Sequence, residues 1–116
     1  MSIKKVFEQA TKTQQLQQQL NKLGNKIHAK GFIGSALSFQ IQALFKESDQ
    51  HFLLIFNDKE EAAYYLNDLE NLISKDYVLF YPGSYRRPYQ IEETDNANVL
   101  LRAEVLNRLK ERKKQL

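Results

Sequence analysis

Two uninterrupted apolar runs constrain the fold of this 116-residue chain more than any other feature. Residues 52–56 read FLLIF and residues 78–81 read VLFY. A strand with one face in water alternates apolar and polar side chains, whereas a continuous apolar run is typical of a strand buried on both faces, as in the middle of a parallel sheet. The two runs therefore predict two central strands.

Helical patterns precede and separate these runs. Residues 2–23 predict two short helices or one broken helix, because residues 11–13 offer a second N-cap. Ser35 can cap a helix that continues to residue 46. Asp58 can begin the next helix, since the spacing from Asp58 to Glu61 fits a capping box.

A third strand and a last helix complete the predicted fold. Residues 26–30 alternate as a strand would, and a helix is predicted to begin at residue 94 or 95, with an apolar face formed by Val99, Leu100, Ala103, Leu106 and Leu109. Alternating strands and helices predict a three-layer α/β fold, a parallel sheet flanked by helices. Three strands are few, so we expect a truncated, partial α/β domain over residues 25–116, preceded by a helical segment over residues 1–24.

Composition excludes several classes of protein. There is no cysteine, so disulfides and thiolate sites are excluded. The apolar runs are too short to span a membrane, and no secretory signal stands at the N-terminus, so we expect a cytoplasmic protein. The net charge of +3 is too mild to indicate nucleic-acid binding by itself.

Residues 31–38, GFIGSALS, lie between a predicted strand and a predicted helix, where a phosphate-binding loop would stand. Compared with the pattern GxxxxGK[ST], the loop has Ala36 in place of the second glycine and Leu37 in place of the lysine. We expect a degenerate loop that keeps part of the backbone course, packs Leu37 inward and binds no ATP. Its candidate weak anion site comprises Gly31, Gly34, Ser35 and Ser38. An ordinary strand–turn–helix explains the same residues equally well.

A second candidate surface is basic and aromatic, and comprises Tyr85, Arg86, Arg87 and Tyr89. Aromatic rings that stack on bases and arginines that bind phosphates would make a single-strand binding surface. A loop packed over the edge of the sheet, or a contact with a neighbouring domain, explains the same residues, and the mild net charge favours packing over nucleic-acid binding. His28 and His51 have no carboxylate or second histidine at ligand spacing, so we predict neither a metal site nor a catalytic residue.

Three segments together resemble a known family. They are residues 31–38, residues 52–63, and a segment over residues 79–106 that includes Asp95 and Arg102. In this order and spacing they are similar to the N-terminal end of the bacterial transcription-repair coupling factors (Mfd). That end is similar to the first domain of the excision-repair protein UvrB. UvrB has an intact Walker A motif at this loop, whereas coupling factors have a degenerate one, as this chain has.

The resemblance implies a multidomain parent, an ATP-dependent double-stranded DNA translocase that displaces stalled RNA polymerase and recruits UvrA. ATP and Mg²⁺ would bind motor domains that lie outside these 116 residues. The expected function is a non-catalytic scaffold with no cofactor of its own, whose partners are the other domains of the parent and, through the parent, UvrA, RNA polymerase and DNA. The alternative is a small nucleotide- or nucleic-acid-binding α/β domain with a variant phosphate loop.

Overall fold

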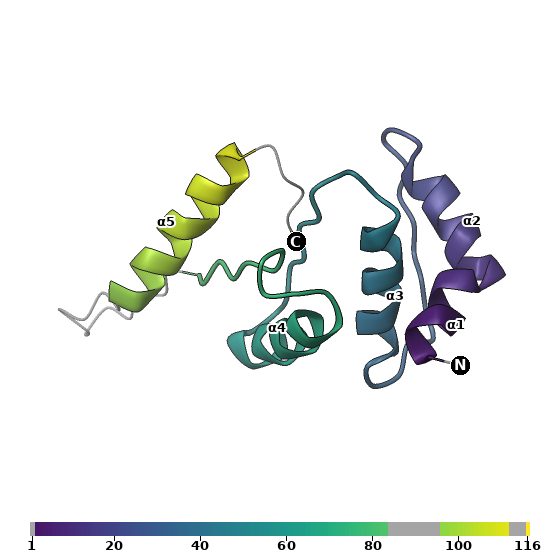
Figure 1. Ribbon diagram of the computed structural model, residues 1–116, viewed down its shortest axis with the longest axis horizontal. Helices are drawn as coiled ribbons and strands as arrows, with labels where there is room; N and C mark the ends of the chain where they lie inside the picture. Colours follow the sequence, from purple (N-terminus) through teal and green to yellow (C-terminus); the bar gives the residue numbers. More distant parts are fainter. Residues whose placement is uncertain (1, 84–95, 112–115) are drawn as a thin grey trace. The chain divides into compact units, whose positions relative to one another are not determined.

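The computed structural model describes residues 2–83, 96–111 and 116 (Figure 1). Its described residues form helices and irregular segments, with no strand. The helices are α1 (Ile3–Gln9), α2 (Thr11–Leu20), α3 (Ala36–Lys46), α4 (Lys59–Leu72) and α5 (Asn96–Lys110). The predicted three-layer α/β fold with a parallel sheet is therefore wrong. The chain forms two compact units, Met1–Asp49 and Gln50–Leu116, while the predicted domain boundary near residue 25 stays a prediction.

The three predicted strands are non-helical segments whose backbones join no sheet ladder in the described part of the chain. Residues 26–30 are exposed and belong to no helix or strand. In residues 52–56, Leu53 and Ile55 are 83% and 85% exposed, and the side chains that alternate with them are half-buried. The continuous apolar run is thus covered on one face only, and the inference of burial on both faces is wrong.

Of the described residues, Leu116 pairs with the last predicted strand. The backbone N–H of Leu116 donates to the carbonyl of Tyr77, and its carbonyl accepts from the N–H of Leu79, both at 2.8 Å. Within the described residues this pairing makes no sheet, because a stable sheet needs several paired strands with a covered face.

Unit 1 is a group of three helices in which α1 and α2 lie beside α3 (Figure 1). The prediction of two short helices is confirmed, but the break lies at Ala10, whose φ of −63° and ψ of 135° are extended. The rings of Phe7 and Phe39 stack with centroids 5.5 Å apart and planes 17° apart, which joins α1 to α3.

In unit 2, α4 begins at the predicted cap. The side chain of Asp58 accepts a 2.7 Å hydrogen bond from the N–H of Glu61, and Glu61 accepts in return from the N–H of Asn57. The return bond of a standard capping box comes from the N-cap residue itself, so here the box is displaced by one residue. The ring of Phe56 stacks on Tyr65 of α4, with centroids 4.8 Å apart, and fixes the chain that enters the helix.

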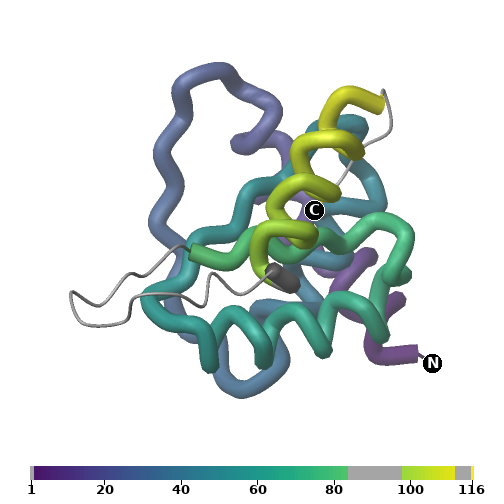
Figure 2. The backbone as a smooth tube through the Cα atoms, turned by 90° about the vertical axis from the view of Figure 1, so that its left-hand side faces the viewer, coloured from purple at the N-terminus to yellow at the C-terminus, as the bar shows by residue number. Residues whose placement is uncertain are grey.

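The helix α5 packs with a different face from the predicted one. Residues 78–80 run between α4 and α5, as the tube in Figure 2 also shows. The side chains of α5 that line this contact are Leu101, Glu104, Val105 and Arg108. Four members of the predicted apolar face remain exposed, namely Val99, Leu100, Leu106 and Leu109.

Candidate functional site

The loop before α3 has the tight turn that its glycines predict. Gly31 and Gly34 have φ angles of 89° and 56°, in the left-handed region that favours glycine. The N–H of Ala36 donates to the carbonyl of Ile33 at 3.1 Å and closes the turn. Ser35 is the N-cap residue of α3, as predicted, although its side chain makes no capping hydrogen bond.

This loop does not present to solvent the charged and hydroxyl groups with which a phosphate loop binds a nucleotide. Ser38, which matches the Mg²⁺-binding hydroxyl of a phosphate loop, is fully buried at 0% exposure. Leu37 stands where a phosphate loop has its lysine, and it is half-buried rather than packed fully inward. Gly31 and Gly34 are exposed, so the four candidate residues do not face one common space. What remains is a backbone turn, and anion binding there stays a prediction.

The second candidate surface, Tyr85, Arg86, Arg87 and Tyr89, lies outside the described residues. Next to it in sequence, the structure pairs Tyr81 with Arg102 of α5. The guanidinium carbon of Arg102 lies 4.9 Å from the ring centroid of Tyr81, and Nη2 of the same arginine donates to the tyrosine hydroxyl at 3.1 Å. This cation–π pair joins residues 21 positions apart, so no local sequence pattern could have predicted it.

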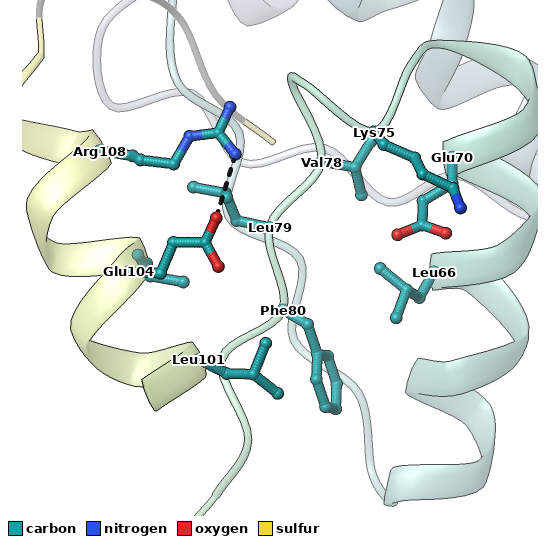
Figure 3. Close-up of a pocket in the computed structure, with 10 residues that line it drawn as sticks. Leu66, Glu70, Lys75, Val78, Leu79, Phe80, Leu101, Glu104 and Arg108 are labelled. Atoms are coloured by element: carbon teal, nitrogen blue, oxygen red, sulfur yellow. Dashed lines mark hydrogen bonds and ion pairs between the residues drawn. The ribbon is translucent and has the colours of Figure 1, made fainter. Parts of the chain in front are cut away.

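A small cleft of about 230 Å³ lies in unit 2 where α4, residues 78–80 and α5 meet (Figure 3). Leu66, Phe80 and Leu101 line its apolar part. Glu104 and Arg108 line its other side and form an ion pair at 3.5 Å, and Arg108 also donates to the carbonyl of Asp76. The cleft is smaller than the ~300–1,000 Å³ typical of ligand sites, and its arginine is already bound. It therefore resembles an imperfectly filled packing gap.

The carboxylate of Glu8 in unit 1 has structural partners. Hydrogen bonds from Lys46 and then from Gln42 hold the pKa of Glu8 below that of a free glutamate, although partial burial opposes the shift. Among the described residues, no three histidine or acidic side chains gather as a metal site would require. His28 and His51 are both exposed. No helix in that part of the chain is long and apolar enough to cross a membrane.

Comparison of the chain with protein-family models, with curated proteins and with solved structures finds no match in any of the three.

Proposed function

We propose that this chain is a non-catalytic scaffold of a bacterial transcription-repair coupling factor and acts in the cytoplasm. The observation that carries the proposal is the loop before α3. It keeps two glycines with positive φ, yet it has Leu37 at the position of the lysine and encloses the hydroxyl of Ser38. A phosphate loop that has lost its charge and its metal ligand can shape a backbone but cannot bind and hydrolyse a nucleotide. This is the degenerate loop that the resemblance to coupling factors implies.

The exposed apolar side chains of unit 2 support a role in contacts between domains. Leu53 and Ile55 are two residues apart on an extended segment, so they point to the same side. Apolar side chains grouped on one side, rather than scattered singly, are typical of a surface that a partner covers. In the proposal, that partner is another domain of the parent, whose motor domains bind ATP, Mg²⁺ and double-stranded DNA. RNA polymerase and UvrA are reached through the parent.

Calorimetric titration with ATP and Mg²⁺ tests the non-catalytic half of the proposal. We expect no heat of binding from the natural chain. The variant Leu37→Lys is the informative second sample, because it restores the charge and leaves Ser38 enclosed. It should bind inorganic triphosphate weakly at most and should not require Mg²⁺. Micromolar, Mg²⁺-dependent binding by the natural chain would instead support the alternative of a small nucleotide-binding domain.

The size of the natural gene product tests the other half. An epitope tag placed within the chromosomal reading frame would be followed by immunoblot and by affinity purification. We expect the tag on a polypeptide far larger than the 13.6 kDa of these 116 residues, and we expect it to copurify with RNA polymerase after transcription is stalled. A free polypeptide of 13.6 kDa that brings down no polymerase would refute the scaffold proposal.

A further inference from the structure

Polar contacts predominate where α1 and α2 meet α3. The hydroxyl of Thr13 donates to Oε1 of Gln40 at 3.3 Å and accepts from Nε2 of the same residue at 3.1 Å. Both side chains are buried. The side chain of Gln17 donates to the carbonyl of Glu47 at 3.1 Å. The interface is thus held at several points by groups that water could satisfy equally well if the helices separated.

The end of α1 is held by a charged contact. Glu8 accepts hydrogen bonds from Nζ of Lys46 at 2.9 Å and from Nε2 of Gln42 at 3.1 Å. The other amide atom, Oε1 of Gln42, is buried without a hydrogen-bond partner. A buried acceptor without a partner costs about 1–3 kcal/mol, so the closed arrangement carries an unfavourable term that opening would remove.

The apolar content of this interface is small. Helix α1 has no buried residue, and the only buried residue of α2 is Thr13. On α3, Phe39, Gln42 and Lys46 share the helix face that meets α1, and Gln40, on the neighbouring side, meets α2. The buried apolar residues Ile41, Leu44 and Phe45 lie on the remaining face of the helix. Removing α1 and α2 would therefore uncover Phe39 beside a row of polar side chains.

The segment between α2 and α3 allows such a movement. It comprises about 15 residues, its first eleven are exposed, and three of its residues are glycines with positive φ. Fully extended, a segment of this length spans roughly 50 Å. A flexible tether of this kind keeps the detached helices at an effective concentration of about a millimolar, so closure is rapid and reversible.

We propose that α1 and α2 form a tethered cover that opens from α3 as a body and exposes a preformed binding face. The face comprises Phe39, Gln40, Gln42 and Lys46. Its occupant is a partner helix that presents an aromatic ring beside a carboxylate, because these are the groups with which Phe7 and Glu8 engage the same face. Such a helix binds only the open fraction of the chain, so the cover lowers its apparent affinity by that fraction. This inference does not depend on the proposed function.

A fluorescent peptide of residues 2–20 is the probe, and anisotropy measures its binding to the full chain. The first variant, Phe7→Ala with Glu8→Gln, weakens the chain's own cover and leaves α3 unchanged. We expect it to bind the peptide at least tenfold more tightly than the natural chain does. The variant Lys12→Glu, which changes an exposed charge on α2, is the matched control and should bind the peptide as the natural chain does.

A charge exchange tests whether the peptide uses the proposed face. Adding Lys46→Glu to the cover-weakened chain should abolish binding of the natural peptide, and a peptide with Glu8→Lys should restore it. Equal binding by the natural and cover-weakened chains, or no rescue by the exchanged charges, would overturn the proposal. Hydrogen exchange provides a further criterion, because loss of protection along α3 in the cover-weakened chain would show that no preformed face exists.

Discussion

Replacing Thr13 by valine removes both hydrogen bonds of a buried polar pair that joins α2 to α3. The change keeps the volume and the branching of the side chain. It leaves the amide of Gln40 buried with neither of its bonds to Thr13. A buried polar group without a partner costs about 1–3 kcal/mol, so we expect the free energy of unfolding of unit 1 to fall by that amount. The variant Gln40→Leu should cost a similar amount, because the hydroxyl of Thr13 then loses its partner.

The double variant distinguishes this reasoning from a simple loss of contacts. When both partners become apolar, no buried group is left unsatisfied, and such replacements are nearly neutral. The double variant should therefore be less destabilised than the sum of the two single variants by about 1–3 kcal/mol, within the range measured for residues in direct contact.

Native-state hydrogen exchange of the α3 amides measures the free energy of unfolding of unit 1 in each of the three variants. Each 1.4 kcal/mol corresponds to a tenfold faster exchange. The control is Thr11→Val, at an exposed position of the same helix two residues before Thr13. It should change the free energy of unfolding by less than ~0.5 kcal/mol. Strictly additive effects of the two single variants would refute the reasoning, as would a neutral Thr13→Val.

Three further predictions concern local features. Asp58→Ala should lower the stability of α4 by about 0.5–2 kcal/mol, seen as faster hydrogen exchange in its first turn, because the N-cap bond is lost; unchanged exchange would show that the cap contributes nothing. Gly31→Ala and Gly34→Ala should each cost about 1–2 kcal/mol in thermal unfolding, since an alanine is strained at positive φ. Gly83→Ala, which meets open space at an ordinary φ, is their control and should be neutral. Because the folded pKa of Glu8 is lowered, its contribution to stability is present above pH ~4.3 and is lost as the pH falls through the folded pKa. Glu8→Gln should remove that part of the pH dependence in urea titrations, and an unchanged profile would contradict it.

Features that depend on neighbouring residues could be predicted from the sequence. The turn before α3 needs glycines because two of its φ angles are positive, and Gly31 and Gly34 in the sequence predict that turn. The start of α4 follows from an aspartate three residues before a glutamate, and the structure has the hydrogen bond that this spacing predicts. In both cases a few neighbouring residues determine the local backbone geometry, so the sequence predicts it directly.

Features that need a distant partner could not be predicted in the same way. An apolar run becomes a central strand only if other strands pair with both its edges, and residues 52–56 join no such ladder in the described structure. The face of α5 was equally ambiguous, because both sides of the helix carry long apolar residues. The inward side contains Arg108, which pairs with Glu104 and the carbonyl of Asp76, and Arg102, which pairs with Tyr81. The contacts of Arg108 with Asp76 and of Arg102 with Tyr81 are long-range and have no local signature, whereas Glu104 and Arg108 are four residues apart on one helix.

The burial of Ser38 shows the same limit at the candidate site. Its position in the phosphate-loop pattern predicts a hydroxyl that faces a ligand, yet the third residue of α3 is turned into the protein. A sequence pattern gives the residue types of a loop, while packing of the following helix decides which of them the solvent can reach. The chemistry of the loop therefore depends on how α3 packs, which its own residues do not specify.

The exposed apolar residues of unit 2 limit what kind of partner can cover them. Fully burying a leucine or isoleucine gains about 1.5–3 kcal/mol. With Leu53 and Ile55 each more than four-fifths exposed, covering both would gain about 2.5–5 kcal/mol. Association of two free molecules costs roughly 4–15 kcal/mol in lost freedom, which this gain does not clearly exceed. A partner in the same polypeptide loses less freedom, since its linker already holds it near. In the proposed function, a partner domain in the same polypeptide would therefore need less apolar surface to bind than a freely diffusing protein would.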